Sequence, residues 1–202
     1  MVRARRAKIQ GFHKFYIAIR HLGHVIENYF ADGGDLGVEI RYLKELSPLG
    51  TAGALSLIQP FPQDSVLITN GDILTDVNFG DLLDFHSHNQ AAAAMAVQVH
   101  ELQHPFGVFQ TNGIEITSHE EKRVLRTLIN AGVYVLEPKV ISLLTKNEAI
   151  DMPTLFEFAR QREFSVVAYL LHEQWADIGS HKDLDCITSL YIGKKIILNL
   201  KQ

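Results

Sequence analysis

The stretch that decides the fold is VLITNGD, residues 66–72. Its apolar first half has no alternating polar residue, so it predicts a buried strand of a parallel sheet. Gly71 ends the strand, because glycine adopts backbone angles that other residues resist. Asp72 then lies at the carboxyl end of the strand, the edge where ligands bind in open α/β sheets. A carboxylate there is either a Mg²⁺ ligand or the cap of the next helix, and this stretch alone does not separate the two.

Strand and helix patterns alternate on both sides of this stretch. Apolar runs bounded by turn residues predict strands, and apolar residues at helical spacing predict helices. The expected strands cover residues 14–19, 38–43, 66–69, 91–99, 129–136 and 164–171, and the expected helices cover residues 22–30, 79–88, 138–144, 155–162 and 182–191. This alternation predicts an α/β protein with a mostly parallel sheet and right-handed crossovers.

One β-hairpin interrupts the alternation. Residues 106–109 and 114–117 flank Thr111-Asn112-Gly113, which is a turn sequence. A hairpin inserted at this point suggests a small lobe over the ligand-binding edge of the sheet.

Length and composition indicate one globular domain. Of 202 residues, 47% are hydrophobic and 21% are charged, and the net charge of −4 gives no sign of a nucleic-acid or membrane surface. No apolar stretch approaches the roughly 18 residues of a membrane helix. Cys186 is the single cysteine, which excludes an internal disulfide and fits a cytoplasmic protein. We expect a basic helix end over residues 1–10, the domain over residues 11–191 and a tail over residues 192–202.

Carboxylates are the candidates for chemistry. Asp72 and Asp177 each follow a predicted strand. If both strands belong to one parallel sheet, both side chains emerge at the same edge and could hold one Mg²⁺ that also binds phosphate oxygens. The small residues of the loop 45–55 suit either a bound anion or tight packing. Glu121-Lys122 would present one acceptor and one cation to a sugar phosphate, or simply be solvated. The ten histidines lack metal-binding spacing, and we interpret them as surface or packing residues.

Five short motifs occur in one order along the chain: PLGTAGAL at 48–55, TNGD at 69–72, EK at 121–122, NAGVYVL at 130–136 and WADIG at 175–179. Each motif is weak alone, but their order and spacing are informative. Together they resemble the sugar-phosphate nucleotidylyltransferases, such as mannose-1-phosphate guanylyltransferase and glucose-1-phosphate thymidylyltransferase. The resemblance covers residues 11–191.

The resemblance implies a Rossmann-like fold and a Mg²⁺-dependent reaction. An oxygen of a sugar-1-phosphate would attack the α-phosphorus of a nucleoside triphosphate in line, and pyrophosphate would leave. Positioning and charge neutralisation would carry the catalysis. Carried over residue by residue, the resemblance places Asp72 and Asp177 on the metal, Glu45, Gly50, Thr51 and Asp72 at the nucleotide, Gly107, Glu121 and Asn130 at the sugar, and Lys122 at the sugar phosphate.

The sequence departs from the family in two places. Arg123 stands where the family usually has proline after Glu-Lys. The family also begins with a strand and a loop like Gly-Gly-x-Gly-Thr-Arg-Leu, followed by a Pro-Lys segment, and neither occurs here. We therefore expect the first central strand to be missing beside residues 66–69, and the arginine and lysine of that segment to be absent. Turnover by this chain is then expected to be weak or absent.

Two alternatives stay open on the sequence. A non-catalytic nucleotide-sugar-binding or regulatory subunit would bind without chemistry. A glycosyltransferase of similar fold would usually carry an Asp-x-Asp motif, which residues 70–72 do not provide. A homo-oligomer is compatible with this sequence, and the nucleobase and the sugar cannot be read from it.

Overall fold

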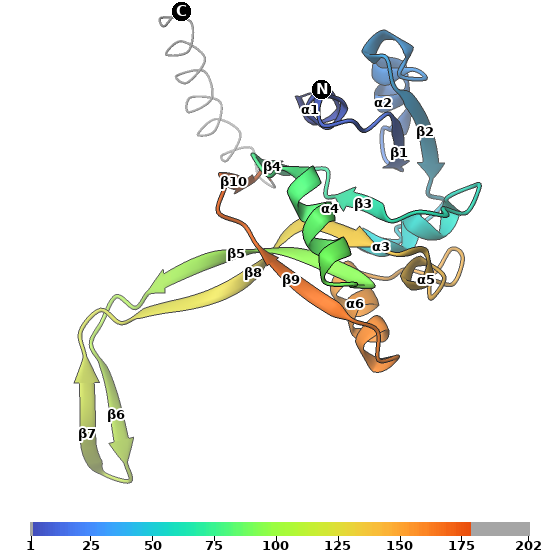
Figure 1. The fold of residues 1–202 in the computed structure, drawn as a ribbon. Coiled ribbons are helices and arrows are strands. Elements are labelled where there is room, and N and C mark those ends of the chain that lie inside the picture. Colours follow the sequence, from blue (N-terminus) through green and yellow to red (C-terminus); the bar gives the residue numbers. More distant parts are fainter. Residues whose placement is uncertain (1, 179–202) are drawn as a thin grey trace, which may run out of the picture.

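The computed structural model describes residues 2–178 and shows an α/β body with a long β-arm (Figure 1). The helices are α1 (Val2–Ile9), α2 (Gly23–Phe30), η1 (Gly34–Leu36), α3 (Gly50–Gly53), η2 (Ala54–Leu57), α4 (Phe79–His88), α5 (Pro138–Ile141) and α6 (Met152–Gln161). The strands are β1 (Lys14–Ile19), β2 (Glu39–Lys44), β3 (Val66–Thr69), β4 (Ile73–Thr75), β5 (Ala93–Gln103), β6 (Val108–Asn112), β7 (Glu115–Glu120), β8 (Val124–Leu136), β9 (Val166–Leu170) and β10 (Trp175–Asp177).

The predicted helix over residues 182–191, the tail over 192–202 and Cys186 lie outside the described residues. The domain limits therefore stay a prediction. Within residues 2–178, no helix is long and apolar enough to cross a membrane.

A four-stranded sheet forms the body, in the order β3-β8-β5-β9. β3, β5 and β9 run in one direction, and β8 runs against its two neighbours. The predicted mostly parallel sheet flanked by helices is thus confirmed, with one difference at β3. Its hydrogen-bonded neighbour is the antiparallel β8, whose residues 133–136 pair with residues 66–69. β3 is half-buried rather than fully buried, because within residues 2–178 a strand pairs with one of its edges and not with the other.

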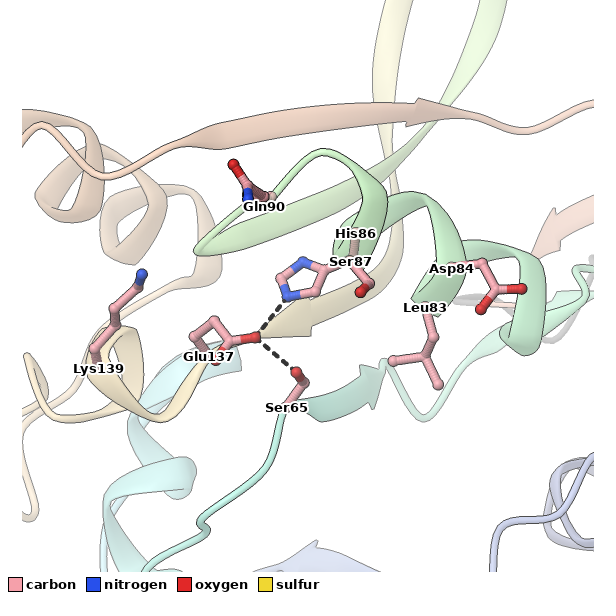
Figure 2. A pocket seen from close by; sticks show the side chains of 9 residues that line it. Ser65, Leu83, Asp84, His86, Ser87, Gln90, Glu137 and Lys139 are labelled. Atoms are coloured by element: carbon pink, nitrogen blue, oxygen red, sulfur yellow. Dashed lines mark hydrogen bonds and ion pairs between the residues drawn. The ribbon is translucent and has the colours of Figure 1, made fainter.

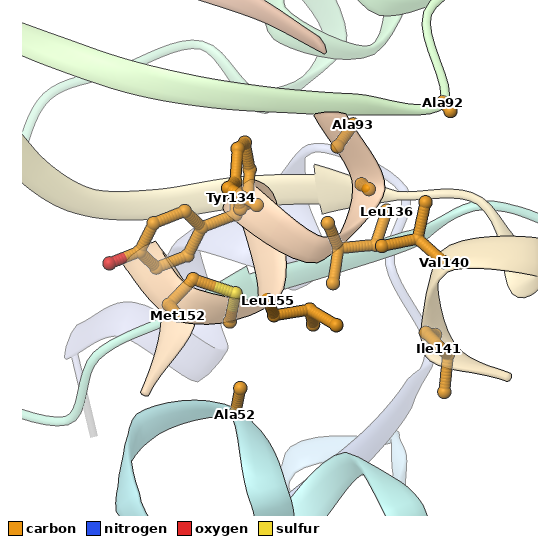
Figure 3. Close-up of a cluster of buried hydrophobic side chains, with 11 residues drawn as sticks. Ala52, Ala92, Ala93, Tyr134, Leu136, Val140, Ile141, Met152 and Leu155 are labelled. Carbon is orange, nitrogen blue, oxygen red and sulfur yellow. The ribbon is translucent and has the colours of Figure 1, made fainter. Parts of the chain in front are cut away.

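Helices cover both faces of this sheet. On one face α3, α5 and α6 enclose a buried cluster that contains Tyr134 and Leu155 (Figure 3). On the other face α4 packs Leu82 against the sheet. Ala93 and Ala94 of β5 point to opposite faces, and both are completely buried. Their small side chains let helices approach from both sides, which explains why an alanine-rich strand lies inside the sheet.

β5 and β8 extend beyond the body as a two-stranded arm that ends in the hairpin β6–β7 (Figure 1). The hairpin was expected at this place in the chain, but it does not cover the ligand-binding edge of the sheet. The reason is the length of β5 and β8, which span 11 and 13 residues and carry the hairpin away from the body. Among the described strands, β8 is the one that pairs with β5 in the arm, because the ladder between β5 and β9 ends at Val97.

β1 and β2 form a separate parallel sheet. Among the described residues, β1 pairs with β2 alone, and no strand pairs with the second edge of β3. The expectation that a central strand is missing beside residues 66–69 stays a prediction. The preceding helix α1 is fastened to the body, because Arg6 forms an ion pair with Asp76 and the side-chain oxygen of Gln10 accepts a hydrogen bond from the Phe79 N–H at 2.7 Å.

Candidate functional site

The candidate site lies at the carboxyl end of β3, where the chain turns into β4. β10 pairs with β4 in antiparallel orientation, so that Asp177 lies opposite Ile73. The N–H of Ile178 also donates a hydrogen bond to the carbonyl oxygen of Asp72 at 2.9 Å. This pairing brings Asp72 and Asp177 to neighbouring backbone positions, and both residues are exposed. The backbones of the two aspartates predicted to bind a metal thus lie next to each other, and their role in metal binding stays a prediction.

β10 is held in place from two sides. The indole Nε1–H of Trp175 donates to the carbonyl oxygen of Ala131 in β8 at 2.7 Å, and the N–H of Asp76 donates to the carbonyl oxygen of Gln174 at 2.9 Å. The sequence analysis attached Asp177 to the strand that is now β9. The structure adds β10 as a short strand of its own, and this strand sets the position of Asp177.

The donor set suits Mg²⁺, which keeps several waters and binds through one or two carboxylates together with substrate phosphates. Asp72 and Asp177 supply such a pair on an exposed edge. No group of three or more His, Cys, Asp and Glu side chains able to hold a metal occurs within residues 2–178. The arrangement therefore fits a metal that takes its remaining ligands from phosphate oxygens and water, not a closed site built by the protein alone.

A β-bulge in β8 lies beside these carboxylates. The register between β5 and β8 shifts opposite residues 130–134. Within the bulge Gly132 has a φ of +70°, and a Cβ at this position would lie 2.8 Å from Cγ1 of Ile73 and 3.0 Å from Nδ2 of Asn70. Glycine is therefore required here both for its backbone angles and for space. Bulges often redirect side chains next to active sites, and here the bulge separates the arm half of β8 from the half inside the body.

Asn130 lies at the arm side of this bulge. Its Oδ1 accepts a hydrogen bond from the N–H of Gly132 at 2.9 Å, and its Nδ2 donates to the hydroxyl of Tyr134 at 2.8 Å. The amide is thus held in a fixed orientation by its own strand. A sugar hydroxyl would have to use the remaining hydrogen-bonding capacity of this amide.

Tyr134 connects the apolar core to the candidate site, and Figure 3 shows its hydroxyl pointing away from the buried cluster. Burial raises the pKa of this hydroxyl above its ordinary value, the hydrogen bond from Asn130 lowers it, and the charges of Asp151 and Asp72 raise it. The negative charges of two aspartates therefore act on one phenol. The sequence analysis missed Asp151 and this role of Tyr134. The apolar run around Tyr134 predicts only a core position. Asp151 has no feature beyond its place before the helix that starts near Pro153.

The loop that leads into α3 brings three predicted nucleotide-binding residues together. The carboxylate of Glu45 accepts a hydrogen bond from the N–H of Leu49 at 3.1 Å, just before Gly50. The N–H of Thr51 donates to Oδ1 of Asp151 at 3.1 Å. Glu45 and Thr51 are thus fixed by contacts within the protein, and their roles toward a nucleotide remain predictions.

The small residues of α3 permit close packing. A Cβ on Gly50 would lie 2.6 Å from the carbonyl oxygen of Ile150, and one on Gly53 would lie 2.4 Å from that of Glu148. The N–H groups of Ala52 and Gly53 both donate to the carbonyl oxygen of Ile150, at 3.0 and 3.2 Å. The tight-packing explanation for these residues is therefore supported. An anion at this helix start would not find these N–H groups free.

The predicted sugar-binding residues lie on the arm. A Cβ on Gly107 would lie 2.9 Å from Oε2 of Glu121, so these two residues are neighbours. Lys122 follows in a turn with a φ of +51°. All three lie where the ribbon of β5 and β8 joins the hairpin β6–β7, whereas Asp72 lies beside β4 in the body (Figure 1). The structure thus brings these sugar-binding candidates together, but it does not bring them to the predicted metal-binding residues.

A second polar cluster lies at the opposite edge of the sheet. Ser65 precedes β3 and Glu137 follows the antiparallel β8, so both lie at the amino end of β3. Oε1 of Glu137 accepts a hydrogen bond from Oγ of Ser65 at 2.7 Å and is hydrogen-bonded to Nε2 of the buried His86 at 2.9 Å (Figure 2). Together with Lys139 and others these residues line a cavity of about 460 Å³.

The contacts of this second cluster indicate a structural role. Burial raises the pKa of Glu137, but the hydrogen bonds from His86 and Ser65 and the charges of His86 and Lys139 outweigh it, so the pKa is lowered. Ser65 is bonded to the carboxylate and not to the imidazole, so the cluster lacks the pairing of nucleophile and base that nucleophilic catalysis requires. His86 matches the interpretation of the histidines as packing residues.

The comparison with known families identifies the family of this chain and does not assign roles to the candidate residues. A family model described as nucleotidyl transferase matches residues 3–191, which include every candidate residue. This chain belongs to the nucleotidyl transferase family. The resemblance drawn from the five motifs is thereby confirmed.

Named relatives of this nucleotidyl transferase act on sugar phosphates. A UTP–glucose-1-phosphate uridylyltransferase of Synechocystis is 32% identical over 193 residues, covering 86% of this chain and 50% of that protein. A mannose-1-phosphate guanyltransferase of Yarrowia lipolytica is 30% identical over 164 residues, covering 77% of this chain and 45% of that protein. The chain thus spans about half the length of the curated relatives it matches.

Solved structures share the fold of this nucleotidyl transferase. One is a Bacillus anthracis protein in complex with sucrose, whose name assigns it provisionally to the glucose-1-phosphate thymidylyltransferases. It superimposes with a TM-score of 0.70 at 20% identity, over 93% of this chain and 79% of that chain. HddC from Yersinia pseudotuberculosis gives a TM-score of 0.67 at 16% identity, over 93% and 83% of the two chains. At these identities the comparison supports the fold alone.

Proposed function

We propose that this nucleotidyl transferase binds a nucleoside triphosphate and a sugar-1-phosphate at the carboxyl end of β3 and takes part in nucleotide-sugar synthesis. The observation that carries the proposal is the pairing of β10 with β4, which brings Asp72 and Asp177 to one exposed edge. The names of the relatives, which specify glucose-1-phosphate and mannose-1-phosphate, support the substrate class.

The residues of this site would act mainly by positioning. Asp72 and Asp177 would hold Mg²⁺, which when bound neutralises charge on the triphosphate as pyrophosphate leaves. Thr51, fixed by Asp151, would contact the nucleotide together with Glu45 and Gly50. Asn130 would bind the sugar. Gly107 and Glu121 would bind the sugar and Lys122 its phosphate only where the arm comes close to this edge, because within one chain they lie away from Asp72 (Figure 1).

Turnover by this chain is proposed to be slow. The sequence contains no Gly-Gly-x-Gly-Thr-Arg-Leu loop whose arginine would neutralise the reacting phosphates. One preorganised charge-stabilising group is typically worth about 2.7–4 kcal/mol of transition-state stabilisation. Binding of substrates and metal is therefore the more sensitive test of the site than the rate of the reaction.

Metal binding tests the site directly. The probe is Mn²⁺, followed by electron paramagnetic resonance with a non-hydrolysable nucleoside triphosphate present. Asp72→Asn and Asp177→Asn are each expected to weaken Mn²⁺ binding by at least about tenfold. Asp64→Asn is the matched control, because Asp64 is also exposed but lies before β3 instead of after it. Equal Mn²⁺ affinity in all three variants would contradict the proposed metal site.

Pyrophosphate release tests the reaction. The chain is incubated with UTP and glucose-1-phosphate, or with GTP and mannose-1-phosphate, with and without Mg²⁺. Slow release that needs Mg²⁺ and both substrates is the expected result. Rapid release would refute the proposed slow turnover but would still support the proposed reaction. Calorimetric binding of a nucleotide sugar without any release of pyrophosphate would instead favour a non-catalytic binding subunit.

A further inference from the structure

Large apolar side chains are exposed along the whole arm. Its large exposed apolar side chains are Val99, Leu102, Phe106, Phe109, Ile114, Ile116, Val124, Leu125 and Leu128. Contiguous exposed apolar surface marks interaction sites, and an isolated two-stranded ribbon is only marginally stable in water. The arm therefore has the character of a surface that is covered by a partner.

One edge of the arm is open to a further strand. Residues 124–130 of β8 pair with β5 on one side, and among the described residues no strand pairs with them on the other, because the ladder with β3 begins at residue 133. The segment reads Val-Leu-Arg-Thr-Leu-Ile-Asn. It carries one charge and no proline, and thus lacks most of the features by which proteins protect free edges.

We propose that a second copy of this chain pairs with this edge, β8 against β8 in antiparallel orientation, about a two-fold axis at Thr127. Thr127 is the midpoint of the open segment. With this register Leu125 lies opposite Ile129 of the second copy, and Arg126 lies opposite Leu128 of the second copy. An axis at Arg126 would instead place two like charges opposite each other, which is destabilising. The segment is therefore self-complementary, as a two-fold interface requires.

The charges of the arm favour a copy over other partners. Residues 99–128 contain four acidic and three basic residues, so two arms meet without strong net repulsion, and the arm offers no basic surface to a nucleic acid or an anionic membrane. Arg126 is already paired with Glu101 across the arm at 2.7 Å, so it brings no unpaired charge to the interface. Two paired arms would form a four-stranded sheet in the order β5-β8-β8-β5, which is more stable than either ribbon alone.

The same register has a consequence for the candidate site. Val124 of one copy would lie opposite Asn130 of the other. The turn that precedes Val124 would then lie beside Gly132 of the other copy. Glu121 and Lys122 of one copy would then approach the edge that carries Asp72 in the other. This composite site rests on the proposed function, whereas the pairing of the two arms does not.

Oligomeric state is the first test. The unmodified chain is expected to sediment as a dimer in the micromolar range, and Leu125→Lys combined with Leu128→Lys is expected to sediment as a monomer with unchanged far-ultraviolet circular dichroism. Leu46→Lys is the control, because Leu46 is 96% exposed in the loop before α3, away from the arm, and should stay dimeric. A monomeric unmodified chain overturns the proposal.

Cross-linking tests the register without relying on a destabilising variant. In a Cys186→Ser background, Thr127→Cys is expected to form a disulfide-linked dimer on mild oxidation, because the two residues face each other on the axis. Ser118→Cys, at an exposed position of β7 on the same arm, should not cross-link. Failure of Thr127→Cys to cross-link overturns this pairing, even if the chain is dimeric through another surface.

Mixing variants tests the composite site. Asp72→Asn and Lys122→Ala would each be impaired, and a mixture is expected to be more active than either one, because a mixed dimer restores one site with Asp72 from one copy and Lys122 from the other. Cross-linking through Thr127 without regained activity would keep the paired arms and overturn only the composite site. Absence of activity in the unmodified dimer would count against the proposed function and leave the pairing intact.

Discussion

The side-chain amide of Asn130 donates a hydrogen bond to the hydroxyl of Tyr134 at 2.8 Å, across the bulge where the arm meets the body. This contact joins the exposed arm to a ring that is buried in the core. Because the hydroxyl also responds to Asp72 and Asp151, its ionisation reports on the electrostatics of the candidate site.

Removal of the Asn130 amide is expected to raise the pKa of Tyr134. Burial already raises this pKa, and the hydrogen bond from Asn130 opposes it by stabilising the phenolate. In Asn130→Ala the phenol should therefore ionise at higher pH than in the unmodified chain. The measurement is tyrosinate absorbance during an alkaline titration, with Tyr134→Phe used to assign the transition. An unchanged or lower pKa would refute the effect of this hydrogen bond.

Removal of the Asp72 charge is expected to shift the same pKa in the opposite direction. The carboxylate of Asp72 disfavours the phenolate of Tyr134, so Asp72→Asn should lower the pKa of the phenol. Asp64→Asn, at the other end of β3, should leave the transition in place. If the pKa of Tyr134 is the same in Asp72→Asn and Asp64→Asn, the charge of Asp72 does not act on this phenol.

Gly132→Ala is expected to destabilise the protein more than Gly113→Ala. Both glycines have positive φ values, +70° and +61°, so both variants incur the cost of a left-handed backbone, about 1 kcal/mol. At Gly113 nothing lies within 4 Å of the new Cβ, but at Gly132 it would contact Ile73 at 2.8 Å. The added overlap should cost roughly 1–3 kcal/mol more. Urea unfolding of both variants measures the difference in the free energy of unfolding. Equal free energies would show that the bulge accommodates the added methyl group without destabilising the protein.

Glu137→Gln is expected to lower the free energy of unfolding at neutral pH by about 1 kcal/mol, a value kept small because a third of the Glu137 side chain is exposed. The pKa of Glu137 is lowered in the folded state from an ordinary value of 4.5. Its stabilisation is therefore fully present above pH 4.5 and is lost as the pH falls through the lowered pKa.

The stability difference between Glu137→Gln and the unmodified chain should thus shrink in acid. Denaturant unfolding at a series of pH values measures it. Glu148→Gln is the control, because Glu148 is an exposed glutamate in the loop between α5 and α6. A difference that stays constant below pH 4.5 would show that the carboxylate charge is not what stabilises the cluster with His86 and Ser65.

Elements with a packed face could be predicted from the sequence. The helix over residues 79–88 was expected with those limits, and its start is capped by Asn78, whose side chain accepts a hydrogen bond from the N–H of Gly80 at 2.9 Å. The full length of β5 and β8 was not predicted, because their arm halves pack on no core within the described residues. Without a buried face their side chains follow no period that distinguishes a strand from a loop.

The candidate site could be predicted only where local sequence marks it. Asp72 follows β3 as expected, because an apolar strand ends directly before it, whereas Asp177 ends the short strand β10, which was not predicted. The metal-binding role of both residues stays a prediction. The contact between Thr51 and Asp151 joins residues 100 positions apart and leaves no local pattern. The direction of the arm could also not be predicted from the sequence, since a turn sequence predicts a hairpin but not the direction in which the hairpin points.

The small sheet of β1 and β2 stands apart from the hydrogen-bond ladders of the body. Among the described residues, its contacts with the rest of the chain include a hydrogen bond from Lys8 to the carbonyl oxygen of Leu36 at 2.7 Å and one from Arg41 to that of Gln59 at 3.2 Å. Phe15 of β1 also packs against the buried cluster that contains Leu82. A unit outside the ladders of the body opens locally without waiting for the rest of the protein. Residues 14–44 are therefore expected to behave as a separate foldon, exchanging their amide hydrogens with solvent long before the core of β5 does.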